Sequence, residues 1–597
     1  MFWADRIAQN IIKSGKYTPF WVDDMFTPSG YAHMGSLRGP LIHDLVYQAL
    51  IDAGEKAKYT YVFNDFDPID GLPDELQERF SRYLGFPLRT APSPEPGFDS
   101  FAQYFSTDFR SVLQKLGVKA EFLSSWDMYH QGKFNNVIKI ALDNAEKIQD
   151  IYQKVSGSKK REKGWLPLQV ICEKCGKLGT TRVYQWNGKT VKYICEPQMV
   201  KWATGCDHKG EISPYDGNGK LPWKVDWPAH WAVLGVTIEG AGKDHSSAGG
   251  SRDIAKALCE EVFHIRNPYN IPYEFFLIGG RKMSSSKGLG VTARNLTELL
   301  PAEIGRFLFS RTDYRQAIEF DPIDTMAIPD LFDEYDRCWT SFNKGVNDSF
   351  ARTFELSQPQ KVKKNKNLFI PRFRDVANYL QLPNVDLTQK FSELKSSNLS
   401  EQENKILKER TSYAKVWLNN YAPQEYRVQV IKEVPASVST LTAAQKEYLK
   451  HVIEILTEKF TPEELQLALY NLAKENKIDP KLAFQSIYLP LLGKSHGPKA
   501  AWLILQENPE FIKKRFNEAI NYKSAVAEKT YAFEILKRPE LFSIDRKVKQ
   551  RFSSINVGLA VIKNITVPAS HAGLDKEISD FVSENKNLTT TDIGSYP

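Results

Sequence analysis

The sequence predicts an α/β fold in its first half, built on a doubly wound parallel sheet, and an all-α fold in its second half. Three observations indicate this. Strand and helix signals alternate over the first hundred residues. Strand signals nearly vanish beyond about residue 300, where apolar residues recur at helical spacing. Between the two regions, four of the six cysteines fall within one short stretch, which is typical of a small metal-binding lobe.

The first strand is expected at residues 17–26, YTPFWVDDMF. The turn TPSG and a helix ending at Gly54 follow it, and a second strand is expected at 57–66. Strand, crossover helix and strand form a βαβ unit, which is the building block of a Rossmann-like, doubly wound sheet.

Strand signals return at 231–242 and 271–280, and each of these runs leads into a glycine-rich loop. We therefore expect a Rossmann-like domain in two halves, 1–100 and 215–300. The stretch between them, 101–214, is predicted to be an inserted connective subdomain that carries the cysteines.

The second half is predicted to be helical because its apolar residues recur three and four positions apart. We expect a connector at 301–345, an all-α domain at 346–525 and a tail of different character at 526–597. Within the tail, VGLAVIKNITVPA at 557–569 predicts a strand and a turn. The helical pattern is clearest in five segments, at 302–312, 329–346, 402–421, 442–456 and 462–476.

The composition is that of a multidomain globular protein. At 597 residues the chain exceeds what one hydrophobic core usually supports. No run approaches the roughly 20 apolar residues that span a bilayer, and the N-terminal MFWADRIAQNIIKSGKY predicts an amphipathic helix in place of a secretory leader. We therefore expect a cytoplasmic protein that is not associated with a membrane. The net charge of +7 permits a polyanionic partner without requiring one.

The clustered cysteines predict a structural zinc site. Cys172 and Cys175 have knuckle spacing, and a predicted hairpin that turns at Asn187-Gly188 brings Cys195 back towards them. With Cys206 and His208 the sequence offers five ligand atoms for four tetrahedral positions. We favour the four thiolates of Cys172, Cys175, Cys195 and Cys206, with His208 as the substitute if Cys206 points away. Four unbound thiols are the alternative, and the isolated Cys259 and Cys338 are expected to be buried apolar side chains.

A first phosphate-handling motif, TPSGYAHMGS at 27–36, lies between a predicted strand and a predicted helix. A nucleotide phosphate can sit against the exposed amides and the positive dipole end of such a helix. Gly30 and Gly35 allow the backbone to approach a ligand closely, and His33 can donate a hydrogen bond to charge that develops on the α-phosphate. The alternative is a strand–turn–helix junction whose glycines serve only the turn.

A second motif, GRKMSSSKG at 280–288, places three hydroxyls and three cations in a glycine-flanked loop after a predicted strand. Lys282 and Lys287 could offset the negative charge of a triphosphate in the transition state. The alternative is a flexible basic surface loop, for which serine and lysine are equally typical.

Together the two motifs resemble the signatures of class I aminoacyl-tRNA synthetases. The usual second motif reads Lys-Met-Ser-Lys-Ser, and the displacement of its second lysine to Lys287 is similar to the form found in class I lysyl-tRNA synthetases. Ser36 stands where the first motif usually ends in His or Asn, which leaves the role of Ser36 open. The resemblance to the lysyl family covers roughly residues 1–525, with further similar segments at 64–68, 223–227, 242–245, 306–322 and 491–502.

The resemblance implies that lysine is attached to tRNA in two steps. The lysine carboxylate attacks the α-phosphorus of ATP, pyrophosphate leaves with Mg²⁺, and the terminal ribose hydroxyl of the tRNA then attacks lysyl-adenylate. The catalytic residues implied are His33, Lys282, Ser284, Ser285, Ser286 and Lys287. The ATP-binding residues implied are Gly30, Gly35, Ser36, Gly242, Asp244 and Met283.

The ammonium of lysine loses water on binding, so its pocket requires an acid or many hydrogen-bond acceptors. Asp65 is the preferred candidate and Asp24 the second, with solvated loop acids as the alternative for each. By resemblance, Trp227 and His245 lie near the adenylate, and Tyr273 lines the amino-acid site. Other acids beside the motif loops are Asp23, Asp67 and Asp70.

The resemblance also implies partners. Residues 346–525 are similar to the helical domain that reads the anticodon in this family, so tRNA(Lys) and L-lysine are the expected partners of a monomer. Residues 539–568 resemble the start of the tRNA-binding domain of the phenylalanyl-tRNA synthetase β-subunit. Our hypothesis is that the chain is a piece of a longer protein or carries a remnant of that domain.

Three other functions compete with this interpretation. One is a class I synthetase for a different amino acid, chiefly glutamate or cysteine. Another is a nucleotidyltransferase of the same superfamily, although such enzymes are usually shorter and need no large helical domain. A third is a catalytically silent tRNA-binding paralogue, against which the presence of His33, Lys282 and Lys287 argues.

Overall fold

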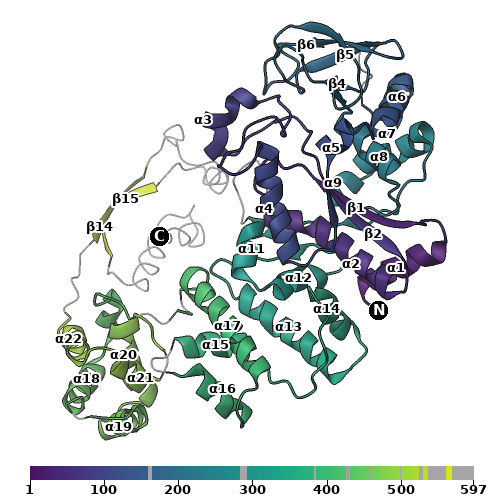
Figure 1. The fold of residues 1–597 in the computed structure, drawn as a ribbon. Coiled ribbons are helices and arrows are strands. Elements are labelled where there is room, and N and C mark those ends of the chain that lie inside the picture. The colour runs from purple at the N-terminus through teal and green to yellow at the C-terminus, as the bar shows by residue number, and fades with distance from the viewer. Residues whose placement is uncertain are drawn as a thin grey trace. The chain divides into compact units, whose positions relative to one another are not determined.

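The computed structural model describes residues 1–158, 164–282, 292–381, 385–424, 426–427, 430–457, 459–497 and 499–522, together with two strands at 529–535 and 560–567 (Figure 1). The chain divides into two compact units, Met1–Arg427 and Val428–Pro597. Among the described residues, no helix is long and apolar enough to cross a membrane.

A parallel sheet forms the centre of the first unit, as the sequence predicts. β1 (Phe20–Phe26) pairs in parallel with β2 (Ala57–Phe63), and β2 pairs in parallel with β3 (Glu121–Ser124). On the other side of β1, parallel bridges join Val22 to Ile238 and Ile238 to Tyr269. Because the chain runs outward from β1 in both directions, the strand order reverses beside β1, and ligands bind at such a point in open α/β sheets.

Helices cover both faces of this sheet. α1 (Trp3–Ser14) and α2 (Arg38–Asp52) pack together, and α2 contacts β1 and β2; Figure 1 shows these four elements side by side. Val22 and Tyr61 belong to the core on the α2 side. Trp21 packs on the opposite side, against α8 (Trp223–Leu234). This alternation along β1 follows from the two-residue period of a strand.

Two strand predictions require correction. Residues 231–234 do not form a strand but the last turn of α8. The helix ends at Leu234 and is capped by Gly235, which adopts φ of 79°. An apolar run that is buried all round cannot be assigned to helix or strand by its pattern. The strand described within 231–242 is β9 (Ala241–Gly242), which pairs in parallel with β10 (Pro272–Tyr273).

The run at 271–280 divides in two. After β10, β11 (Phe276–Ile278) leaves the main sheet and lies between β12 (Arg281–Lys282) and β13 (Ile318–Glu319). Gly279 and Gly280 make the tight turn from β11 to β12, both with positive φ. A two-residue hairpin turn of this kind suits glycine, which tolerates the left-handed backbone.

The range 101–214 begins with elements that pack on the sheet. α4 (Phe101–Lys115) contributes Phe109 and Val112 to the main core, and β3 is the third strand of the sheet. Three helices follow: α5 (Ser125–His130), α6 (Asn135–Asp143) and α7 (Ala145–Ser156). A small β lobe then holds the cysteines, and Figure 1 draws its strands together. Its strands are β4 (Gln169–Val170), β5 (Thr181–Trp186), β6 (Val191–Cys195), β7 (Lys209–Ile212) and β8 (Gly219–Lys220).

Short elements connect the larger ones. They are η1 (Met34–Leu37), η2 (Asp74–Leu76), α3 (Gln77–Phe80), η3 (Ser81–Tyr83), α9 (Lys243–Ser246), α10 (Ser251–Leu258), the π-helical turn η4 (Cys259–Phe263), α11 (Ala293–Leu299) and α12 (Ala302–Ser310).

The predicted helical region is confirmed, and most of its described helices begin at a residue whose side chain caps the helix. The first unit contains α13 (Ala327–Lys344), α14 (Ser349–Ser357), α15 (Phe373–Leu380), α16 (Leu387–Lys395) and α17 (Glu401–Asn420). At α17, Ser400 and Glu403 form a reciprocal capping box, which satisfies two amides that the helix leaves unpaired.

The second unit has a helical core of its own. Its helices are η6 (Ala436–Thr440), α18 (Ala443–Ile455), α19 (Pro462–Glu475), α20 (Pro480–Leu492), α21 (Ala500–Gln506) and α22 (Pro509–Ile520). β14 (Lys529–Ile535) and β15 (Ala560–Val567) pair antiparallel, so the predicted strand in the tail is confirmed.

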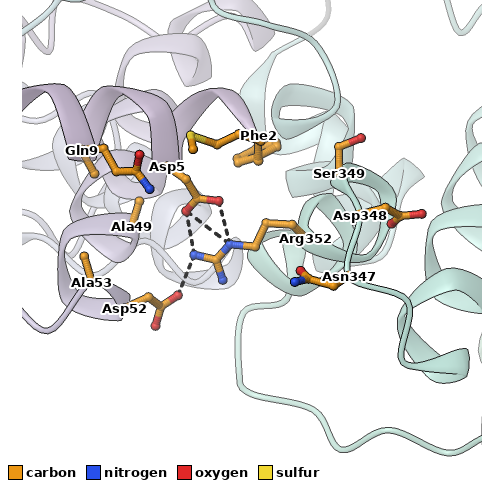
Figure 2. Close-up of a pocket in the computed structure, with 12 residues that line it drawn as sticks. Phe2, Asp5, Gln9, Ala49, Asp52, Ala53, Asn347, Asp348, Ser349 and Arg352 are labelled. Carbon is orange, nitrogen blue, oxygen red and sulfur yellow. Dashed lines mark hydrogen bonds and ion pairs between the residues drawn. The ribbon is translucent and has the colours of Figure 1, made fainter.

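An arginine joins the N-terminal helix to the helical region of the first unit. Arg352 of α14 donates to Asp5 of α1 and lies 2.9 Å from Asp52 at the end of α2. It also pairs with Glu355 at 2.7 Å. Figure 2 shows Arg352 reaching into a pocket towards Asp5 and Asp52. This ion-pair network is only partly exposed, so it holds the three helices together more strongly than a surface pair would.

Candidate active site

The first motif lies where the strand order reverses. β1 ends at Phe26, the loop 27–33 follows, and η1 leads directly into α2. The amide of Ser36 donates to His33 Nδ1 at 3.1 Å. A ring nitrogen that accepts a hydrogen bond carries no proton, so in the neutral ring the proton is assigned to Nε2. His33 therefore has the donor that phosphate chemistry requires.

The first motif pairs through its backbone with the segment that follows the second motif. His33 forms an antiparallel bridge with Thr292, and the amide of Ala293 donates to the carbonyl of Ala32 at 2.8 Å. Lys282 is the last residue of β12 and pairs with Leu277. Met283, Ser284, Ser285, Ser286 and Lys287 lie outside the described residues.

Gly30 occupies a close-packed position in the loop after β1. A Cβ on Gly30 would lie 3.2 Å from Pro73 Cγ. Gly35 and Ser36 belong to η1. Gly242 caps α9, which carries Asp244 and His245 directly after β9. The carboxyl ends of β1 and β9 thus bring both loops to the same edge of the parallel sheet.

Three carboxylates are buried beside this edge. Asp23 is 0% exposed, Asp24 8% and Glu239 1%. Within the described structure, Asp23 Oδ2 and Asp24 Oδ2 accept no hydrogen bond. Burial raises the pKa of Asp23 well above its ordinary range, and the nearby Glu239 raises it further. Such a group of acids is costly without a cation, so the arrangement favours a cationic ligand.

Asp24 faces an opening that a glycine creates. A Cβ on Gly39 would lie 2.7 Å from Asp24 Oδ2 and 3.0 Å from the Tyr273 hydroxyl. His43 Nδ1 lies 3.4 Å from the same carboxylate oxygen, and it also donates to the Gly39 carbonyl at 2.8 Å. His43 Nε2 accepts from the amide of Gly240, so this ring is neutral in the arrangement observed. Asp24 Oδ2 therefore lies next to Gly39 and Tyr273 with no hydrogen-bond partner among the described residues.

Aromatic side chains form the adjoining wall. The Trp227 ring stacks on Trp223 with centroids 5.5 Å apart, and His245 lies 6.1 Å from Trp227. The Trp227 indole donates to Glu239 at 2.6 Å, and the Trp231 indole donates to the other oxygen of that carboxylate. Burial raises the pKa of Glu239 to about 7. The structure thus brings Asp24, Tyr273, Trp227 and His245 to one region.

Asp65 has partners of its own. Its Oδ1 accepts from the Trp126 amide at 2.8 Å and the Ser125 hydroxyl at 3.2 Å. Its Oδ2 accepts from the Ser124 hydroxyl at 2.7 Å. Both oxygens thus bind the first turn of α5, and this favours a helix-capping role for Asp65 over contact with a ligand.

The four clustered cysteines converge in the β lobe. The Sγ atoms of Cys172, Cys175, Cys195 and Cys206 all lie within 4.8 Å of one another. Cys172 and Cys206 are 3.6 Å apart, and Cys175 and Cys195 are 3.7 Å apart. Cys206 thus points inward. His208 contributes its backbone carbonyl, which accepts from the Cys195 amide at 2.9 Å, and its ring lies beside Tyr193.

The predicted hairpin explains this convergence. β5 and β6 pair antiparallel around Asn187-Gly188, and Gly188 has φ of 92°. The amide of Cys206 donates to Cys195 Sγ at 3.3 Å, and the Thr180 hydroxyl lies 3.2 Å from the same sulfur. Polar groups around a ligating sulfur are typical of metal sites, where they fix the orientation of the ligand.

Comparison with known proteins assigns the family. Residues 1–360 match the family described as tRNA synthetases class I (K). The chain belongs to this family. It is 33% identical over 549 residues to a lysine–tRNA ligase of Methanosarcina barkeri, covering 88% of this chain and 98% of that protein. It is 34% identical over 547 residues to lysine–tRNA ligase 1 of Methanosarcina acetivorans, covering 87% and 99%. A lysine–tRNA ligase of Archaeoglobus fulgidus is 32% identical over 523 residues, which cover 87% of this chain and 100% of that protein.

Family membership confirms the resemblance that the two motifs indicate. Sequence reasoning nevertheless missed Glu239 and His43, which lie within the buried acidic group of this synthetase. The signal for Glu239 was an acid within the apolar run VTIEGAG. His43 has no such signal, because a lone histidine in an amphipathic helix is usually an ordinary core residue.

Proposed function

We propose that the protein attaches lysine to tRNA(Lys) at the expense of ATP, through a lysyl-adenylate intermediate. The observation that supports this most is the bridge between His33 and Thr292, which joins the first motif to the segment that follows the second. Membership of the class I (K) family and the names of its relatives support the substrate assignment.

In the first step, ATP would lie across the carboxyl edge of the sheet, with its phosphates against the loop 27–36. Mg²⁺, when bound with ATP, would offset the negative charge of the phosphates. His33 Nε2–H donates to the α-phosphate as negative charge develops there. Gly30 and Gly35 admit the phosphates to the backbone, Ser36 assists them, and Gly242 and Asp244 hold the ribose. The second motif supplies positive charge through Lys282 and Lys287, and hydrogen-bond donors through the three serines between them.

In the lysine pocket, Asp24 Oδ2 accepts from the ammonium, and the Tyr273 hydroxyl lies beside it. Trp227 and His245 form the wall between this pocket and the adenylate. Asp24 Oδ1 accepts from the Met25 amide at 2.9 Å, whereas Oδ2 has no hydrogen-bond partner among the described residues. This free acceptor supports the assignment, because a bound ammonium would satisfy it. Asp24 thus replaces Asp65 as our preferred lysine ligand.

The four thiolates would hold a structural Zn²⁺. Sulfurs at about 2.3 Å from a tetrahedral zinc lie roughly 3.8 Å from one another, and the observed separations of 3.6 and 3.7 Å fit this value. The lobe is small, so metal binding would supply part of its folding energy. His208 is not needed as a ligand while Cys206 points inward.

The helical domain at 346–525 would bind the anticodon arm of tRNA(Lys), with aromatic and basic side chains stacking on unpaired bases. The domain borders given above, the connector at 301–345 and the monomeric state belong to the same proposal.

The test is charging of total tRNA with each labelled amino acid, followed by acid-gel separation. Formation of lysyl-tRNA supports the proposal, and charging with another amino acid in its place overturns it.

A further inference from the structure

A buried lysine outside the predicted motifs lies where three parts of the first unit meet. Lys220, at the end of β8, is 3% exposed. Its Nζ lies 2.9 Å from Asp67 Oδ1 and 2.7 Å from Asp226 Oδ2. Asp67 belongs to the segment after β2, and Asp226 lies on α8 directly before Trp227. The cation therefore comes from the β lobe, and both anions come from the domain that carries the active site.

Asp67 connects Lys220 to the first motif. Its Oδ2 accepts from the Thr27 hydroxyl at 2.8 Å, while its Oδ1 faces Lys220. Thr27 is the first residue of the loop that ends at His33. The orientation of the Asp67 carboxylate is thus set on one side by Lys220, and it sets the position of Thr27 on the other side.

The surroundings keep this group charged and fixed. Burial disfavours a charged lysine, but Asp226 and Asp67 outweigh burial and raise the pKa of Lys220 above its ordinary value. The Tyr129 hydroxyl donates to the Asp226 oxygen that Lys220 does not face. A buried pair with its remaining acceptors satisfied has one favoured geometry.

The backbone of the β lobe reaches the same segment. The amides of Leu178 and Gly179 both donate to the Gly85 carbonyl, at 2.7 and 3.0 Å, and the amide of Gly85 donates to Ile69 at 2.9 Å. β8 pairs with β4, whose last residue, Val170, lies close in sequence to Cys172. The cysteine lobe therefore supports the Asp67 segment through two independent sets of contacts.

We propose that Lys220 is a positioning residue for ATP, which acts through Asp67 and Thr27 to fix the first-motif loop against the cysteine lobe. This rests on the proposed function, since it concerns the ATP step of that reaction. A purely structural lysine would instead affect the amount of folded enzyme and leave the KM for ATP unchanged.

The test is a double-mutant cycle of Lys220→Met and Thr27→Val, read as kcat/KM for ATP in lysine-dependent pyrophosphate exchange. Each single change is expected to raise the KM for ATP about tenfold, the usual effect of losing a hydrogen bond to a charged group. The kcat/KM of the double variant is expected to equal that of the less active single variant, because both changes break the same connection. Lys139→Met, which breaks an exposed ion pair with Asp143 on α6, is the matched control.

The inference would be overturned if the fold-losses in kcat/KM of the two single variants multiplied in the double variant. A lower kcat with an unchanged KM for ATP would also overturn it. If Lys220→Met does not fold, Asp67→Asn takes its place in the cycle and the same outcomes decide. If the wild-type chain shows no exchange, the proposed function fails. The cycle is then measured as the Kd for ATP by calorimetry, where coupled effects support the connection and independent effects overturn it.

Discussion

Replacing Asp24 by asparagine should have two effects: it should weaken lysine binding, and it should stabilise the protein in the absence of lysine. Asp24 is 8% exposed, and its Oδ2 accepts no hydrogen bond among the described residues. A hydrogen bond to a charged group contributes about 1.5–3 kcal/mol. At about 1.4 kcal/mol per factor of ten, Asp24→Asn should raise the KM for lysine roughly 10- to 150-fold. Because the replaced Oδ2 accepts no hydrogen bond among the described residues, Asp24→Asn should also raise the Tm in the absence of lysine.

The assay pairs the KM for lysine in pyrophosphate exchange with the Tm from calorimetry. Asp65→Asn is the matched comparison, because Asp65 is a buried acid whose oxygens bind the start of α5. It should lower the Tm and change the KM for lysine little. If Asp24→Asn left the KM for lysine unchanged, or if Asp65→Asn raised it more, the assignment of the ammonium partner would be refuted.

Three further results are expected. Cys172→Ser should abolish the binding of one zinc per chain and lower the Tm, whereas Cys338→Ser, outside the cluster, should keep the zinc; metal analysis decides. Burial raises the pKa of Glu239 to about 7 from 4.5, so the folded chain retains a proton that the unfolded chain loses, and its stability falls as the pH rises from about 5 to 7. Glu239→Gln should lose that slope in calorimetric scans, and an unchanged slope would contradict the assignment. Arg352→Met should lower the free energy of unfolding by about 1–3 kcal/mol in urea titration, and no change would show that its ion pairs contribute nothing.

The sequence was sufficient to predict elements whose signals are local. The first βαβ unit, the hairpin at Asn187-Gly188 and the five helical segments depend on period, turn residues and caps that lie close together in the chain. For the same reason, the convergence of the four cysteines could be expected from their spacing and the hairpin.

Features that depend on contacts between distant segments could not be predicted. The apolar run at 231–234 is helical because it is buried on all sides, which a pattern cannot reveal. Asp65 could not be told from Asp24 as a lysine ligand, because only the structure shows that α5 occupies its oxygens. The pairing of Lys220 with Asp67 likewise joins segments far apart in sequence.

Amino-acid-dependent ATP–pyrophosphate exchange, run with each of the twenty amino acids with and without tRNA, tests the proposed activity most directly. We expect exchange with lysine, because the buried carboxylates beside Tyr273 favour an ammonium at the edge of the sheet that carries the first motif. Exchange with a different amino acid would contradict the lysine assignment. The absence of exchange from a folded, zinc-loaded sample under every condition would contradict catalysis itself.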